Sequence, residues 1–303
     1  MDHGSISSGF TAMIGFLGLE NSATKVEEAN ILIIPVPLEY STSYGKGTAT
    51  GPEAIINASF YLECYDEELD DEVWKAGIFT TEAINITSDP ANSLDIIKNV
   101  ISSYINDDKF IVILGGEHSL TAAVHEAFYK KYQNISVLQL DAHSDLRNEY
   151  EGSKYSHACV MRRIWEKNKN IVEIGIRSQC KEEKEFISKN RIPVFYAHEL
   201  YGKPFPLKIL DDLNDDVYIT IDADFFDPAI MPSVGTPEPG GFSWYETLHF
   251  LKTVITHKNV VGIDVVEFSP IKDLVHPDFL LAKFIYKLIG YKINKKRKNN
   301  EKH

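Results

Sequence analysis

The 303-residue sequence has few cysteines, and their arrangement gives no sign of disulfide pairing. Its three cysteines, Cys64, Cys159 and Cys180, are widely spaced and contain no Cys-x-x-Cys motif. An odd, scattered set of this kind argues against a disulfide framework and favours a reducing compartment. The cytoplasm is therefore the expected location.

Long apolar runs and an excess of positive charge are also missing. No apolar stretch approaches the roughly 20 residues that a membrane-spanning helix needs, and no basic segment followed by an apolar core marks a signal peptide. Acidic residues outnumber basic ones by 44 to 31, which gives a net charge of −13. We therefore expect no membrane partner and no nucleic-acid partner. The negative charge is compatible with a small cationic substrate.

Apolar, β-branched segments alternate with amphipathic ones along the chain. Strand patterns cover residues 31–37, 110–114, 136–140, 171–176, 194–195, 217–221 and 260–265. One helix can begin at Pro52, and further helical patterns cover residues 92–104, 120–131, 244–256 and 277–288. This alternation predicts a three-layer α/β/α fold with a central, mostly parallel sheet. We expect residues 1–291 to form a single domain, and the basic, polar residues 292–303 to form a disordered tail.

Acidic residues and histidines gather where three of these strand patterns end. Asp141-Ala142-His143-Ser144-Asp145 and Asp222-Ala223-Asp224 each follow one pattern, and His118 follows another. Alternate residues of an extended chain point to the same side, and ligands of open parallel sheets collect at the carboxyl ends of the strands. The sequence therefore predicts a single site there with four carboxylates and two imidazoles.

Four carboxylates held together need opposing charge, which two divalent cations would supply. The donors are mostly oxygen with some imidazole and no thiolate, a set that suits Mn²⁺ better than structural Zn²⁺. A pair of such ions activates water near neutral pH and polarises a neighbouring electrophile. We therefore predict metal-assisted hydrolysis. The candidate ligands are His118, Asp141, His143, Asp145, Asp222 and Asp224.

The ordered set of motifs resembles the ureohydrolase family, which includes arginase and agmatinase. The matching segments are residues 51–55, 115–119, 141–145, 222–228, 235–241 and 266–270. The resemblance extends from about residue 31 to residue 291. It implies an arginase-like fold, two Mn²⁺ ions per subunit, a small guanidino substrate and a closed homo-oligomer, either a trimer or a hexamer.

The same resemblance implies how the ligands are shared. His118, Asp141, Asp145 and Asp224 would surround one ion, and His143 and Asp222 would serve the other. Some carboxylates would bridge, because six side chains cannot fill two separate octahedra.

Three residues receive catalytic roles from the resemblance. Glu267 would accept two parallel hydrogen bonds from the guanidinium group and orient it for attack. Asp145 would help to hold the attacking water, and His157 would protonate the leaving amine. The alternatives are an exposed glutamate at a strand end and a structural loop histidine.

The loop between Asp145 and His157 bears on the choice of substrate. It resembles the agmatinase branch rather than the Asn- and Ser-bearing loop with which arginases hold an amino-acid head group. Glu149 and Tyr150 could accommodate the ammonium end of agmatine, although Arg147 could equally meet a carboxylate. We predict an agmatinase of polyamine biosynthesis that releases urea and putrescine. Alternatives are arginase, guanidinobutyrase, another guanidino-compound ureohydrolase, or a catalytically inactive metal-binding homologue.

Overall fold

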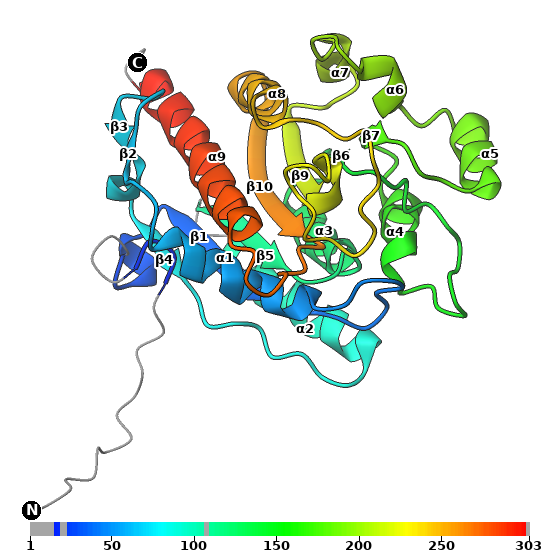
Figure 1. Ribbon diagram of the computed structural model, residues 1–303, viewed down its shortest axis with the longest axis horizontal. Coiled ribbons are helices and arrows are strands. Elements are labelled where there is room, and N and C mark those ends of the chain that lie inside the picture. Colours follow the sequence, from blue (N-terminus) through cyan, green and yellow to red (C-terminus); the bar gives the residue numbers. More distant parts are fainter. Residues whose placement is uncertain (1–14, 19–22, 106–108, 301–303) are drawn as a thin grey trace, which may run out of the picture.

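Within the described part of the chain, eight strands form one sheet in which every neighbouring pair is parallel. The computed structural model describes residues 15–18, 23–105 and 109–300, with side chains up to residue 297. The strand order is β4-β1-β5-β10-β9-β6-β7-β8 (Figure 1). The strands are β1 (Ile31–Val36), β4 (Ile78–Thr80), β5 (Phe110–Gly115), β6 (Ser136–Leu140), β7 (Ile171–Ile176), β8 (Val194–Tyr196), β9 (Asp216–Asp222) and β10 (Asn259–Val266). β2 (Tyr65–Asp66) and β3 (Asp71–Glu72) form a separate antiparallel pair.

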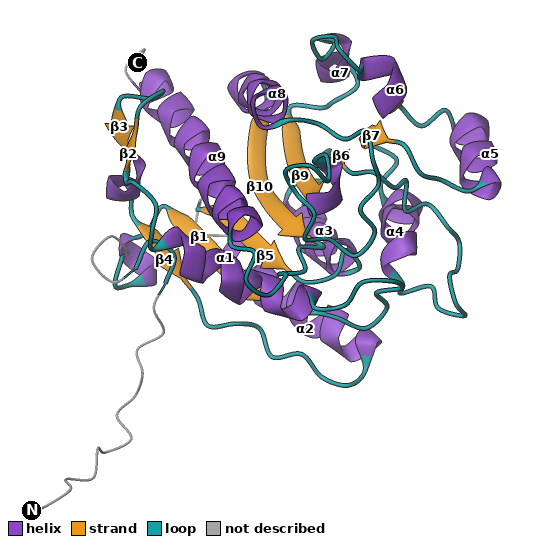
Figure 2. Cartoon of the chain, viewed as in Figure 1, coloured by secondary structure: helices purple, strands orange, loops and turns teal. Residues whose placement is uncertain are grey.

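Helices cover both faces of the sheet (Figure 2). They are α1 (Gly51–Ser59), α2 (Pro90–Tyr104), α3 (Leu120–Lys131), α4 (Val160–Lys167), α5 (Lys181–Asn190), α6 (Ala197–Leu200), α7 (Lys208–Asp211), α8 (Trp244–His257) and α9 (His276–Asn300). One apolar cluster joins α1, α8 and α9 to the sheet, and another joins α2 and α3 to the opposite face. β1 is buried along its whole length, as expected of a parallel strand covered on both sides.

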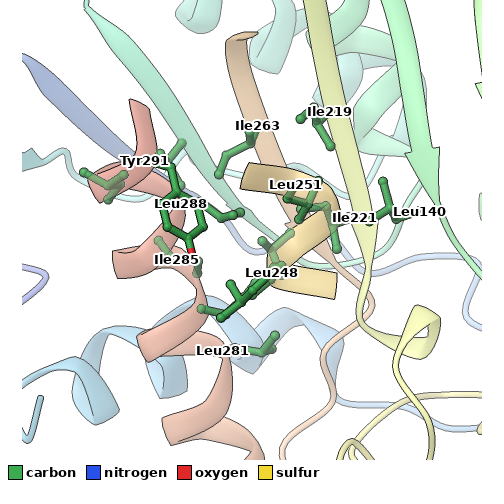
Figure 3. Packing of buried hydrophobic residues seen from close by; sticks show 14 of the residues in the cluster. Leu140, Ile219, Ile221, Leu248, Leu251, Ile263, Leu281, Ile285, Leu288 and Tyr291 are labelled. Carbon is green, nitrogen blue, oxygen red and sulfur yellow. The ribbon is translucent and has the colours of Figure 1, made fainter. Parts of the chain in front are cut away.

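The packing of α8 and α9 shows how the sequence produces this layer. Apolar residues recur every three or four positions on each helix, which places them on one face. In α9 these residues include Leu281, Ile285 and Leu288, and they pack near Ile221 and Ile263 of the sheet (Figure 3). Burying each such side chain contributes roughly 1.5–3 kcal/mol relative to leaving it exposed.

The predicted fold class is confirmed. The apolar strand patterns and the helices with a clear apolar stripe were recognised from sequence with ends shifted by only a few residues, apart from the C-terminal helix. The prediction omitted β2, β3 and β4 and the helices α4, α5, α6 and α7. Five of these elements have four residues or fewer, and α5 is rich in charged residues, with the sequence KEEKEFISKN.

The C-terminal segment differs from the disordered tail that was expected, because α9 continues to Asn300. Ile293 is buried. Lys292 Nζ donates to the carbonyl of Val260, and Lys295 Nζ donates to that of Lys258, both at 2.6 Å. Arg297 pairs with Asp71. The basic residues thus find acceptors at the amino end of β10 and on β3. Residues 301–303 lie outside the described residues, and the single domain over residues 1–291 stays a prediction.

Two further observations concern the cysteines and the search for a membrane-spanning helix. The three cysteines are free. In the described part of the chain, no helix combines the length and the apolar character that crossing a membrane would require.

Removing the end of α9 should destabilise the protein. A chain ending at Tyr291 loses the buried Ile293 side chain and two hydrogen bonds from lysines, which together are worth on the order of 3 kcal/mol. We expect a melting temperature several degrees lower by differential scanning calorimetry. A chain ending at Asn300 is the control and should melt like the full chain. Equal melting temperatures for all three chains would contradict the structural role of this segment.

Candidate metal centre and substrate pocket

The predicted site residues lie at the carboxyl ends of β5, β10, β9 and β6, which are adjacent in the sheet. His118 lies in the turn between β5 and α3, and Glu267 follows β10 directly. The 141–145 segment follows β6. Asp222 ends β9, and Asp224 lies in the short 3-10 helix Ala223–Phe225. The four central strands therefore bring together residues that are up to 149 positions apart in the sequence.

Three carboxylates surround one nitrogen of His118. Its Nδ1 atom lies 3.1 Å from an oxygen of Asp145, 3.2 Å from one of Asp141 and 3.6 Å from one of Asp222. This nitrogen is buried and makes no hydrogen bond. His118, Asp141 and Asp145 have the mutual spacing of a metal-binding group. An orphaned imidazole nitrogen facing carboxylates is the arrangement that a divalent cation would complete.

A second group forms around His143. Its Nδ1 atom lies 2.9 Å from Asp224 and 3.7 Å from Asp141. Asp141, His143 and Asp224 again have the spacing of a metal-binding group. Asp141 belongs to both groups and offers one oxygen to each, so it is placed to bridge two ions.

This geometry changes the ligand partition that the family resemblance implied. Asp224 was expected beside His118 and Asp222 beside His143. The structure places Asp222 against His118 and Asp224 against His143. The backbone explains why the two aspartates face the opposite histidines from those expected. Asp222 is still on the strand, whereas Asp224 has turned away with the short helix.

Burial and mutual repulsion act strongly on these carboxylates. Burial raises the pKa of Asp222 well above its usual range, and repulsion from the carboxylates of Asp224, Asp141 and Glu267 adds to this effect. Burial and the neighbouring Asp141 likewise raise the pKa of Asp145. Among the described residues, no lysine or arginine forms an ion pair with these aspartates. Divalent cations fit such a cluster, because their charge would favour the ionised carboxylates.

A chain of buried hydrogen bonds fixes the orientation of His118. Its Nε2 atom lies 2.8 Å from Thr220 Oγ1, and Thr220 donates to Asp264 at 2.6 Å. Asp264 also accepts hydrogen bonds from Thr121 and Tyr218. With Nε2 committed to Thr220, Nδ1 is left to bind a metal, which is how outer partners usually set the tautomer of a metal-binding histidine. The sequence analysis missed Asp264, although an aspartate inside an apolar strand is a usable signal.

Glu267 is held in a fixed position by the backbone. Its N–H donates to the carbonyl of Gly116 at 2.8 Å, and its Oε1 accepts from the N–H of His118 at 2.6 Å. Glu267 and Asp145 have positive φ angles of 60° and 52°. Non-glycine residues adopt this conformation uncommonly, because it brings the side chain close to the backbone. At Gly116 a Cβ atom would lie 2.0 Å from the carbonyl oxygen of Leu38, so the turn requires glycine.

His157 lies beside the metal groups at the start of the 3-10 helix His157–Cys159. Its backbone N–H donates to Ser41 Oγ at 2.9 Å, and its Nδ1 atom lies 3.2 Å from the same oxygen. The ring is partly exposed to a pocket that also contains Glu267.

That pocket is narrow, with a volume of about 30 Å³. The predicted residues in its lining are His143, Asp145, His157, Asp222, Asp224 and Glu267. Two loops complete the lining with Thr42, Ser43, Tyr44, Gly45, Gly235 and Thr236, and no lysine or arginine is among the lining residues. The sequence analysis did not assign these loop residues to the site, because only the fold brings the two loops together.

Glu149 and Tyr150 do not line this pocket. Glu149 is exposed. The ring of Tyr150 packs edge-on against His157 with ring centres 5.9 Å apart, and the guanidinium of Arg147 lies over the Tyr150 ring, 5.1 Å from its centre. Direct contact between Glu149 or Tyr150 and a substrate stays a prediction.

A larger cavity of about 600 Å³ lies elsewhere, between residues 202–210 and α8. Phe205, Leu210 and Phe250 contribute to its largely apolar lining, and none of the predicted site residues borders it. Its size alone does not make it the site, because chemistry requires the convergent polar groups that the small pocket has.

Comparison with known proteins agrees with this geometry. The sequence model described as the arginase family matches residues 29–290. The chain is 41% identical to an N(1)-aminopropylagmatine ureohydrolase of Synechocystis over 90% of this chain and 92% of that protein. It is 35% identical to an agmatinase of Bacillus cereus, with 87% and 92% covered. This chain belongs to the arginase family.

The structural comparison supports the same assignment. The fold superposes on the agmatine ureohydrolase of Thermoplasma volcanium with a TM-score of 0.87 and 29% identity, covering 95% of this chain and 97% of that one. It also matches the arginase of Bacillus subtilis with a TM-score of 0.75 and 24% identity, which shows a shared fold. The protein is thus a ureohydrolase, a hydrolase of linear amidines.

Arg177 has a structural position in this ureohydrolase. Its guanidinium donates to the backbone carbonyl of Asp224, and to that of Glu238 at 2.9 Å. It therefore ties the turn that carries Asp224 to the neighbouring loop.

Asp141→Asn should lower both the metal content and the turnover of this ureohydrolase. The change removes a negative charge from the residue that both groups share, so two cations lose part of their opposing charge. We expect clearly fewer than two equivalents of metal by elemental analysis of Mn²⁺-loaded, desalted protein. Asp212→Asn, at an exposed position, is the matched control and should bind metal like the parent. Full metal content in Asp141→Asn would contradict the ligand assignment.

Proposed function

We propose that this ureohydrolase is a manganese-dependent agmatinase that hydrolyses agmatine to urea and putrescine. The observation that carries the proposal is the convergence of Glu267, His157 and two metal-binding groups on one pocket whose lining contains no lysine or arginine. Such a pocket favours a cationic guanidino group and disfavours a substrate carboxylate. Relatives named as agmatinases, at 33–35% identity, agree with this choice.

The metal requirement follows from the donors. His118, Asp141, Asp145 and Asp222 would hold one Mn²⁺ ion, and His143, Asp141 and Asp224 the other. When bound, two such ions supply an activated water and polarise the guanidinium carbon. Asp145 lines the pocket, where its carboxylate can accept a hydrogen bond from that water.

Glu267 would orient the substrate. One of its oxygens is fixed by the N–H of His118, and no described residue hydrogen-bonds to the other. The free oxygen can therefore accept from the guanidinium, and the fixed one retains a lone pair for a second N–H. Because the backbone sets the position of this carboxylate, the guanidinium carbon would be held over the metal groups before attack.

His157 would supply the proton that allows the amine to leave. No described residue hydrogen-bonds to its Nε2 atom, so this nitrogen is available to the substrate. An imidazole titrates in the range that suits proton transfer near neutral pH. The proton moves from Nε2 to the departing nitrogen as the carbon–nitrogen bond breaks, which releases putrescine and leaves urea.

N(1)-aminopropylagmatine is a second candidate substrate. Four relatives at 34–41% identity are named as ureohydrolases of that compound, including the Synechocystis protein. Both candidates present the same guanidinium to the pocket and differ only in the amine at the far end. Tyr44, which lines the pocket and is 83% exposed, lies where a longer cationic chain would emerge.

A panel of guanidino compounds should identify the substrate. We expect the Mn²⁺-loaded protein to release urea from agmatine or N(1)-aminopropylagmatine in a colorimetric assay. The kcat/KM for arginine and guanidinobutyrate should be far lower, because their carboxylates find no lysine or arginine in the pocket lining. A preference for N(1)-aminopropylagmatine would replace the first candidate by the second. A preference for arginine would overturn both, and no urea from any compound would indicate an inactive homologue.

The variants His157→Ala and Glu267→Gln should both lose activity, but with different effects on kcat and KM. Removing a positioned general acid lowers the rate by about 10²–10⁴-fold, so His157→Ala should lose kcat and keep KM and metal. Glu267→Gln removes the charge that faces a cation, so KM should rise as kcat falls. Steady-state kinetics with metal analysis separates the two. Unchanged kcat in His157→Ala would contradict its role as the acid.

We further propose that the protein works in the cytoplasm as a closed homotrimer or homohexamer. The free cysteines are consistent with the cytoplasmic location, and the family resemblance supports the oligomeric state. A monomer in sedimentation at micromolar concentration would contradict the oligomer.

A further inference from the structure

We propose that Ser41, itself fixed by Glu117, is a positioning residue that sets the tautomer and the orientation of His157. The inference rests on the proposed function, in which His157 protonates the leaving amine. The three residues come from separate segments, namely the loop after β1, the turn after β5 and the start of the 3-10 helix His157–Cys159. The fold brings them into one hydrogen-bonded chain.

Glu117 is the fixed end of this chain. Its side chain is fully buried. One oxygen accepts from the backbone N–H groups of Tyr40 and Ser41, at 2.5 and 2.6 Å. The other accepts from the hydroxyls of Ser41, at 2.9 Å, and of Ser119. Four donors thus converge on one carboxylate, which holds the Ser41 backbone and side chain in place.

The contacts of Ser41 determine where its proton points. A hydroxyl has one proton and two lone pairs. The proton is donated to Glu117, so the oxygen can only accept from its other partners. These are the backbone N–H of His157, at 2.9 Å, and His157 Nδ1, at 3.2 Å. Nδ1 must therefore carry a hydrogen to make its contact.

This arrangement has a direct consequence for proton transfer. When Nδ1 keeps its hydrogen throughout, the proton that His157 gains and loses is the one on Nε2. Nε2 has no hydrogen-bond partner among the described residues, and His157 lines the pocket. The chain from Glu117 through Ser41 thus presents the exchangeable proton to the substrate. Glu117 also immediately precedes His118, so one turn positions both a metal-group residue and the support of the acid.

Ser41→Ala tests the proposal. We expect kcat for urea release to fall on the order of 10–100-fold, part of what a general acid contributes, while KM and metal content stay unchanged. Ser41→Thr keeps the hydroxyl and should recover most of the rate. Ser136→Ala is the matched control, because Ser136 is a buried serine that accepts one backbone N–H, from Asn214, at the opposite edge of the sheet. This control should keep the kcat of the parent.

The double variant Ser41→Ala/His157→Ala distinguishes positioning from a general structural effect. If Ser41 acts through His157, the double variant should have the same kcat as His157→Ala alone. An equal loss of kcat from Ser41→Ala in both backgrounds would overturn the proposal, as would a normal kcat in Ser41→Ala alone.

A spectroscopic measurement makes the test independent of activity. In ¹⁵N NMR spectra of the Mg²⁺-loaded protein, neutral His157, assigned by its loss in His157→Ala, should be the Nδ1–H tautomer and should shift towards Nε2–H in Ser41→Ala. An Nε2–H tautomer in the parent would overturn the proposal. If the parent releases no urea but shows the predicted tautomer, the proposed function fails while the positioning by Ser41 stands.

Discussion

The crowding of carboxylates at one edge of the sheet is the constraint on which the rest of this structure depends. Asp141, Asp145, Asp222 and Asp224 are buried with no lysine or arginine partner among the described residues, and burial and repulsion raise the pKa values of Asp145 and Asp222. Such an arrangement is unfavourable unless cations balance it. No lysine or arginine of the described residues balances these carboxylates, and the centre is therefore suited to holding metal ions.

The parallel sheet is what keeps these groups together. β5, β10, β9 and β6 are neighbours, and all four end at the same edge. Each contributes its polar residues directly after a run of buried apolar ones, so the core that stabilises the sheet also fixes the site. At the carboxyl ends of these strands, Asp145 and Glu267 adopt positive φ angles. The hydrogen bonds of Glu267 to Gly116 and His118 hold that conformation.

Around the metal groups lies a layer of buried polar side chains that direct the two key imidazoles. Thr220, which donates to Asp264, contacts Nε2 of His118 and leaves Nδ1 free for a metal. Ser41, which donates to Glu117, contacts Nδ1 of His157 and, in the proposed function, leaves Nε2 for the substrate. The two histidines thus leave opposite nitrogens without a hydrogen bond, and in the proposed function one would be a metal ligand and the other the acid. In each case the contacting hydroxyl donates its own hydrogen bond to a buried carboxylate.

The sequence alone determined the fold class, most strands and which acidic and histidine residues gather at the candidate metal centre. These depend on local patterns, namely apolar runs, helical periodicity and acidic clusters that follow strands. Only the tertiary structure decided how Asp222 and Asp224 are divided between the two histidines, since that depends on where β9 ends and the chain turns. It also decided the contacts of Ser41 and Asp264 and the course of the C-terminal helix, where lysines meet the backbone of β10. These features join residues distant in sequence, and no local pattern encodes which donor will reach which acceptor.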